Sequence, residues 1–232
     1  SSACKSCQNT TEEVVGLLLE LDSNNFAAKE VDKQGNLCIH SLCEKNVPNA
    51  KLIMMLADIY PEGLAIKDRD GNLPIHSAIE RGDKMPVEVI SKLLNGFPGA
   101  TKKHDKDKNL PLHCAFHCLQ SHLVEVASLL VSVDGESVAE PSKQLGLLLH
   151  WACSNLKPVE LIRAMVQANP AAVGMKDKGG NTVLHIACEL GDRCPAGVIE
   201  VLARAYPECV KIKDKDGNTP LHSAAECCDK TT

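Results

Sequence analysis

A Leu-His or Ile-His pair recurs six times along the chain at nearly constant spacing, and this recurrence restricts the fold more than any other feature. Successive histidines of these pairs are separated by 36, 37, 37, 35 and 37 residues, counted along the sequence. The six are His40, His76, His113, His150, His185 and His222. A fixed period of this length is typical of a solenoid, in which each copy buries its apolar face against its neighbours. The 232 residues therefore predict one elongated array rather than one or two globular domains.

The last copy, DKDGNTPLHSAAE from Asp214 to Glu226, shows what one unit contains. Its first five residues predict a tight turn, because Gly217 can adopt a left-handed backbone conformation without steric cost. Thr219 stands where a helix would begin and can cap a free backbone N–H group. Pro220 follows at the first helical position, where its missing N–H does no harm. A helix this short depends on its neighbours for stability.

A second helix follows in the full copies and ends at a proline. In the second copy the inner helix is predicted over residues 74–81, and the outer helix starts at Pro86 and ends at Phe97-Pro98. The same exit recurs as Tyr60-Pro61, Asn169-Pro170 and Tyr206-Pro207. Because a proline disfavours helical geometry in the residue before it, each of these pairs predicts the end of an outer helix.

With the T-P-L-H motif of its last copy present in six phased versions, the chain resembles the ankyrin-repeat family over nearly its whole length. The resemblance implies an all-α, ankyrin-type helix-turn-helix solenoid with short turn-like β-hairpin fingers. The period exceeds the usual one of about 33 residues, so this is a long-period variant with an aromatic-Pro exit. Thr opens the inner helix only at Thr182 and Thr219. Leucine replaces it in the other four copies, whose helices we expect to lack a side-chain cap.

Alignment on these motifs divides the chain into repeats. The predicted boundaries are a frayed N-terminus with a half-repeat cap at 1–31, repeats at 32–67, 68–104, 105–141, 142–176 and 177–213, and a partial repeat at 214–232. The repeat at 142–176 is irregular, because residues 133–141 lack the aromatic-Pro exit, and we expect a less stable finger around residues 132–147. The last copy has no outer helix, so we expect an uncovered apolar face and a chain that is a piece of a longer protein.

The six phased histidines suggest a metal site, but their spacing opposes one. A zinc site needs about four ligands in one small shell, and side chains placed one per repeat cannot converge on one ion. The resemblance implies a structural role instead, in which each ring bonds backbone groups and ties neighbouring repeats together. We therefore predict no cofactor and no metal site.

Cysteine leaves an alternative open, since the chain contains 12. Cys4 and Cys7 form a CxxC pair without a matching second pair, and Cys114 and Cys118 lie one helical turn apart with His117 between them. These residues could make the chain a metal- or redox-responsive sensor. Abundant unpaired cysteine fits a reducing compartment, so we expect an intracellular protein of the cytoplasm or the nucleus.

Several function classes are disfavoured by the sequence. It contains no GxSxG, HExxH or GxxxxGK motif, so we predict that the chain is not an enzyme. A net charge of −5 and a pI near 6.0 argue against nucleic-acid binding, which needs a basic stripe. No apolar run approaches the roughly 18 residues of a membrane span.

A binding surface remains, and the resemblance implies that finger tips and inner helices form it on a concave side. A basic residue recurs at one finger-tip position in every copy, which suggests a structural duty such as ion pairing along the fingers. Specificity should lie mainly where copies differ. The predicted partner-binding residues are Lys45, Arg69, Arg81, Lys106, His117, Cys118, Trp151, Ser154, Asn155 and Leu190. We expect a monomeric, non-enzymatic scaffold that binds an unidentified protein or peptide; the alternatives are the sensor or a structural spacer within a longer protein.

Overall fold

The computed structural model describes residues 12–21 and 26–229. Its contacts divide the chain into two compact units, Ser1–Leu129 and Leu130–Thr232. Helices make up most of the described residues in both units, which confirms the predicted all-α class. Across the described part of the chain, no helix has the length and apolar character that crossing a membrane requires.

The elements follow one another in a regular order. Unit 1 contains α2 (Glu12–Leu21), α3 (Phe26–Lys29), α4 (Cys38–Cys43), α5 (Ala50–Ile59), η1 (Pro61–Ala65), α6 (Pro74–Glu80), η2 (Gly82–Lys84), α7 (Val87–Gly96), η3 (Pro98–Lys102) and α8 (Pro111–Cys118). The boundary between the units falls within α9 (Leu123–Val133). Unit 2 continues with η4 (Gly135–Val138), β1 (Pro141–Ser142), β2 (Gly146–Leu147), α10 (Leu148–Ser154), α11 (Val159–Ala168), η5 (Pro170–Gly174), α12 (Val183–Glu189), η6 (Gly191–Arg193), α13 (Ala196–Ala205), η7 (Pro207–Lys211) and α14 (Pro220–Asp229).

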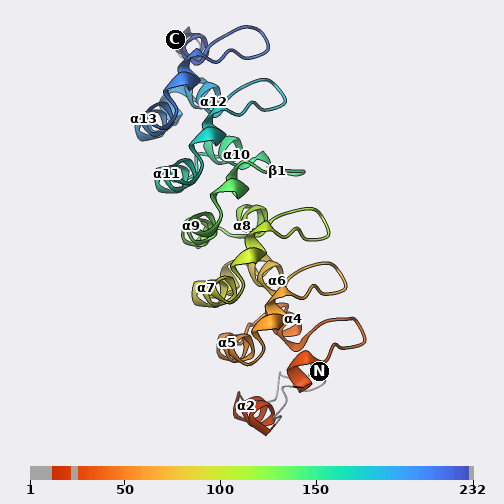
Figure 1. Ribbon diagram of the computed structural model, residues 1–232. Coiled ribbons are helices and arrows are strands. Elements are labelled where there is room, and N and C mark those ends of the chain that lie inside the picture. The colour runs from red at the N-terminus through yellow and green to blue at the C-terminus, as the bar shows by residue number, and fades with distance from the viewer. Residues whose placement is uncertain (1–11, 22–25, 230–232) are drawn as a thin grey trace. The chain divides into compact units, whose positions relative to one another are not determined.

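Within each unit the helices form two layers (Figure 1). The inner helices, which follow the fingers directly, are α4, α6 and α8 in unit 1 and α10, α12 and α14 in unit 2. Helices of one layer pack on one another: α6 on α8 and α5 on α7 in unit 1, and α10 on α12 and α11 on α13 in unit 2. The core between the layers is aliphatic, as shown by Ile79 and Ile90 in unit 1 and by Leu149 and Leu161 in unit 2, all at most 1% exposed.

An aspartate closes the regular fingers. In the second copy, the carboxylate Oδ1 of Asp68 accepts the backbone N–H of Asn72 at 2.8 Å, and the backbone N–H of Asp68 donates to the carbonyl of Asn72 at 2.9 Å. Gly71 supplies the left-handed conformation of this turn, with φ of 82°. In the third copy Lys108 takes that conformation, with φ of 65°. The recurring Asp, Gly and Asn of the sequence therefore shape the finger.

The fourth finger is built differently. Here β1 and β2 pair antiparallel, with Pro141 opposite Leu147 and Ser142 opposite Gly146. Ser142 stands where the other copies have aspartate, and its hydroxyl oxygen accepts the N–H groups of Gln144 at 3.3 Å and Leu145 at 3.4 Å. The irregularity predicted from the sequence thus takes the form of a short β-hairpin.

The outer helices end at the predicted prolines, and one further outer helix ends in a similar way without a proline. The 3-10 helices η1, η3, η5 and η7 each begin at the proline of an exit pair. At the end of the third copy η4 makes a similar exit without proline, because Asp134 has the same φ of −144° that Phe97 has before η3. A Cβ on Gly135 would lie 2.6 Å from the carbonyl oxygen of Ala168, so this residue must be glycine for α11 to pack against the exit.

Histidine compensates for the missing threonine caps. The backbone N–H of Leu73 donates to Nδ1 of His76 at 3.2 Å, and that of Leu110 donates to Nδ1 of His113 at 2.9 Å. Thr182 makes the same bond through its backbone N–H, so the cap does not depend on threonine. As expected, neither Leu73 nor Leu110 forms a side-chain cap hydrogen bond; instead, the histidine three residues on accepts the backbone N–H of the leucine.

The start of α9 is stabilised from another repeat. The carboxylate of Asp83, which follows α6, accepts the backbone N–H groups of Gln120 at 3.1 Å, Ser121 at 3.0 Å and His122 at 3.5 Å. These hydrogen bonds, that of Ser121 above all, lower the pKa of Asp83 to about 2. A carboxylate placed before a helix also interacts favourably with the helix dipole.

Candidate partner-binding groove

A groove opens on the finger side of unit 2. Its volume is about 950 Å³, and it is lined by residues 141–147 of the hairpin, residues 175–178 before the next finger, and side chains of the inner helices α10 and α12. We call it the finger groove. The helix side chains that line it are His150, Trp151, Ser154 and Ile186.

The floor of the finger groove combines an aromatic ring with fixed polar groups. Trp151 is half-buried, and Nζ of Lys157 lies 5.1 Å from the centroid of its ring, within the range of a cation–π interaction. The hydroxyl of Ser154 donates to the carbonyl of His150 at 2.9 Å. Burial lowers the pKa of His150, so its ring is neutral at physiological pH. The side chains of the floor therefore have partners within the protein and carry no formal charge.

The rim of the finger groove is basic. Lys143, Lys176 and Lys178 line it, against one carboxylate from Asp177. That carboxylate is engaged, because its Oδ1 accepts the backbone N–H groups of Gly179 at 2.8 Å and Asn181 at 2.9 Å. The groove therefore suits a ligand that brings negative charge.

Three buried histidines connect an inner helix to the finger region that follows it. Nε2 of His76 lies 3.1 Å from the carbonyl oxygen of Lys103, Nε2 of His150 lies 3.0 Å from that of Asn181, and Nε2 of His185 lies 3.2 Å from that of Asn218. Where Nδ1 accepts a backbone N–H, as in His76, the proton resides on Nε2, which donates to the carbonyl. Burial lowers the pKa of His76 to about 4, so this ring stays neutral.

The family comparison agrees with this arrangement. The family model described as ankyrin repeats (3 copies) matches residues 149–231. Residues 149–231 are ankyrin repeats. The crystal structure of the ankyrin repeat domain of Bcl-3, a member of the IkappaB protein family, matches with a TM-score of 0.63 at 18% identity and covers 91% of this chain and 86% of that chain.

A second solved structure is similar in fold. It is the complex of a predatory endopeptidase from Bdellovibrio bacteriovorus with an immunity protein, and one of its chains matches with a TM-score of 0.59 at 17% identity, over 87% of this chain and 95% of that chain. A search of curated proteins gives no match. At these identities the structural likeness shows the fold alone, and it confirms the predicted ankyrin-type solenoid.

The predicted partner-binding residues lie in both units of the chain. In unit 2, Trp151 and Ser154 line the finger groove. Asn155 is exposed and donates through Nδ2 to the carbonyl of Trp151 at 2.8 Å, while the half-buried Leu190 ends α12. The other six belong to unit 1: Arg69, Lys106 and His117 are exposed, and Lys45, Arg81 and Cys118 are half-buried.

Some of these positions serve contacts between repeats. Arg81 donates through Nη1 to the carbonyl of Glu44 at 2.9 Å, which joins two successive inner helices. At the finger tips, Nζ of Lys215 donates to the carbonyl of Lys178. The observed role of this tip lysine is a bond to the neighbouring backbone, where the sequence suggested ion pairing.

Sequence reasoning missed part of the groove. Ile186 follows its histidine directly, as Trp151 follows His150, so the repeat phase could have identified it. Met175 and Lys176 precede a finger, and no motif in the sequence marks that segment. Met175 and Lys176 line the finger groove because the segment before the next finger lies opposite the hairpin of the fourth copy.

The cysteines have few properties of a sensor. Eight of those described are free thiols, and Cys38 is disulfide-bonded. Burial raises the pKa values of Cys114 and Cys118, so both are protonated at neutral pH, whereas metals and oxidants react with thiolates. No group of three His, Cys, Asp or Glu residues suited to a metal ion occurs among the described residues. Cys4 and Cys7 lie outside them.

Proposed function

We propose that this chain is a non-enzymatic interaction module that binds an extended segment of a partner protein in the finger groove. The observation that carries the proposal is the groove of about 950 Å³ between the hairpin of the fourth copy and the next finger. Its walls are held by hydrogen bonds in the free protein, so little conformational entropy would be lost on binding. One of the solved structures with a similar fold is a complex of two proteins, which is the kind of assembly proposed.

The groove indicates the chemistry of the segment. Trp151, Leu145 and Ile186 offer apolar surface, and aromatic residues at the centre of an interface contribute much of its binding energy. Lys143 and Lys178 are exposed at the rim. The preferred segment therefore combines a bulky apolar side chain with nearby Asp or Glu residues.

The chain provides its own optical probe for a test. Trp151 is its only tryptophan, so ligands in the finger groove should change its fluorescence. Peptides selected on the intact chain from a random displayed library should be enriched in acidic and apolar residues. They should also shift the emission of Trp151 on titration.

Charge reversal then locates the site. The double variant Lys143→Glu with Lys178→Glu should weaken binding of the selected peptides by about tenfold or more, without a change in melting temperature. Its matched control is Lys84→Glu with Lys211→Glu, the same charge change at two exposed lysines that do not line the groove. If the control weakens binding as much as the groove variant, or if Trp151 does not respond, the finger groove is not the binding site.

Two further proposals concern the state of the protein. We propose that it is a monomer and that it resides in the cytoplasm or the nucleus, because the eight free thiols of the described residues outnumber the disulfide-bonded Cys38. Sedimentation equilibrium and cell fractionation test these points. A dimer at micromolar concentration, or recovery in a secreted fraction, would contradict them.

A further inference from the structure

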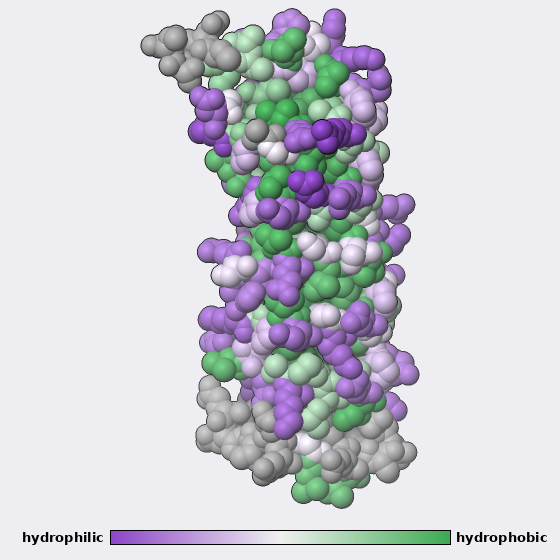
Figure 2. All heavy atoms as spheres, turned by 90° about the vertical axis from the view of Figure 1, so that its left-hand side faces the viewer, coloured by the Kyte–Doolittle hydropathy of each residue, from purple (hydrophilic) through white to green (hydrophobic). Residues whose placement is uncertain are grey.

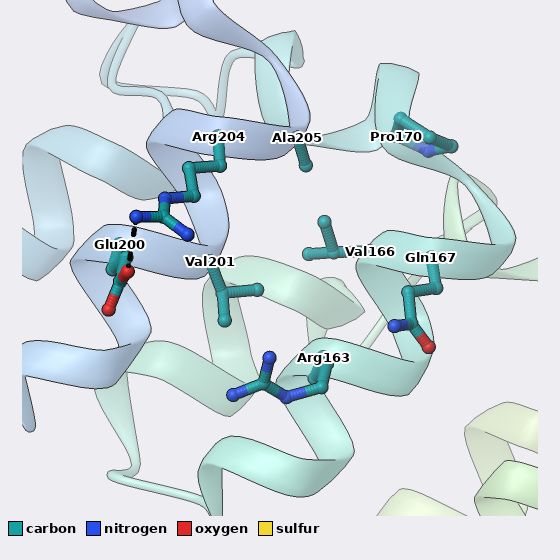
Figure 3. A pocket seen from close by; sticks show the side chains of 8 residues that line it. All are labelled: Arg163, Val166, Gln167, Pro170, Glu200, Val201, Arg204 and Ala205. Carbon is teal, nitrogen blue, oxygen red and sulfur yellow. Dashed lines mark ion pairs between the residues drawn. The ribbon is translucent and has the colours of Figure 1, made fainter.

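The outer helices of unit 2 form a second groove, away from the fingers. Its volume is about 400 Å³, and it lies between α11 and α13, on the face of the molecule shown in Figure 2. We call it the outer groove. Val166 and Val201 point toward one another across its floor, with Arg163 and Arg204 on opposite sides of them (Figure 3).

The floor is apolar and the sides are cationic. Val166 is 1% exposed, Val201 is half-buried, and Ala205 extends the floor along α13. Arg204 is paired within its own helix, its Nη2 lying 2.9 Å from Oε1 of Glu200. Arg163 is exposed and has no hydrogen bond or ion pair to any described residue. With two guanidinium groups and one carboxylate, the outer groove has an excess of positive charge.

The matching position in unit 1 is occupied by a salt bridge. There Lys92 of α7 pairs with Asp58 of α5 across the two outer helices. Counted from the exit proline, the residues at these positions in unit 2 are Val201 and Gln167. These two cannot form an ion pair, so the space between α11 and α13 is not bridged by charge and its apolar floor is accessible.

We propose that the outer groove binds a short acidic segment of a partner protein that carries one aliphatic side chain. The aliphatic side chain contacts Val201 and Ala205 above the buried Val166, and flanking carboxylates pair with Arg163 and Arg204. Guanidinium groups bind carboxylates through two parallel hydrogen bonds, which favours Asp or Glu over other acceptors. This surface is separate from the finger groove, so the chain could hold two segments at once.

The test uses a defined probe and the full chain. The probe is the peptide acetyl-Glu-Leu-Leu-Glu-amide, compared with acetyl-Lys-Leu-Leu-Lys-amide and acetyl-Glu-Ser-Ser-Glu-amide. Methyl NMR on protein labelled at valine should show shifts at Val166 and Val201 with the first peptide, with a dissociation constant of about 1 mM that is typical of so small a ligand. The basic and serine peptides should bind at least about tenfold more weakly. Salt at about 0.5 M should weaken the first interaction.

A matched pair of variants locates the contact. Arg163→Glu should weaken binding of the acidic peptide by about tenfold, whereas Arg193→Glu, at an exposed arginine that does not line the groove, should leave it unchanged. Circular dichroism checks that both variants are folded. The proposal is overturned by equal binding of the acidic and basic peptides, by shifts that persist in Arg163→Glu, or by no shift up to about 10 mM. Self-association of the chain that Arg163→Glu abolishes would show a second copy as the occupant instead.

Discussion

Acidification from about pH 7 to about pH 5 should destabilise unit 1 through His76. The buried ring has a pKa of about 4, lowered from its ordinary 6.5 mainly by desolvation, although the nearby Asp105 raises it. In the unfolded chain the ring takes up a proton near pH 6.5, and in the folded protein it does so only near pH 4. The stabilisation is therefore complete above pH 6.5 and is lost progressively as the pH falls through about 4.

The size of this effect follows from the pKa difference. One pKa unit corresponds to about 1.4 kcal/mol, and at about pH 5 some 1.5 units of the difference are expressed. The free energy of unfolding should therefore fall by about 2 kcal/mol between about pH 7 and about pH 5 on account of His76. Urea titrations followed by circular dichroism measure this fall in the intact chain, provided that the denaturant slope is the same at both pH values.

A variant isolates the contribution of this one ring. His76→Gln cannot take up a proton, so it should be less stable than the wild type at about pH 7 but lose about 2 kcal/mol less on acidification. His104→Gln, at an exposed histidine, should lose as much as the wild type. If His76→Gln and the wild type lose the same free energy, the ring is not held neutral by the fold and the reasoning fails.

Three further substitutions test the structure. Leu184→Ala should cost about 2–5 kcal/mol by urea titration because Leu184 is 3% exposed, whereas Leu221→Ala should cost less than about 0.5 kcal/mol because Leu221 is 76% exposed. Gly217→Ala should cost about 1 kcal/mol for its φ of 87°, and Gly180→Ala should cost clearly more, because its Cβ would lie 2.8 Å from the backbone nitrogen of the next finger; equal melting temperatures would contradict this. Asp83→Asn should lower the melting temperature at neutral pH, and its difference from the wild type should shrink as the pH falls from about 4 toward 2, where Asp83 itself becomes protonated.

Much of the fold was predictable because short motifs within each repeat determine its turns and the ends of its helices. The Asp, Gly and Asn of the finger and the proline of the exit act through local backbone contacts, which a single copy reveals. The exceptions involve residues that act across repeats. Gly135 replaces an exit proline because α11 passes close by, and Asp83 stabilises a helix that starts 40 residues later along the chain.

The candidate sites were predictable only in part. Trp151 and Ser154 followed from their departure from the other copies, and both line the finger groove. The outer groove gave no such signal, because it depends on which pair of side chains two facing helices present. In unit 1, the ion pair of Lys92 with Asp58 lies between the two facing outer helices. The sequence of a single repeat does not show which residues of another helix it will face.

The aspartate that closes each regular finger has a consequence for engineering. Since Oδ1 of Asp32, Asp105, Asp177 and Asp214 accepts backbone N–H groups two and four residues further on, the loop conformation is held by the main chain and this one carboxylate. The side chains between these anchor points contribute little to that conformation. Tip residues such as Gln34 and Asp70 could therefore be randomised as a library, with the aspartates kept, to direct the same framework toward new ligands.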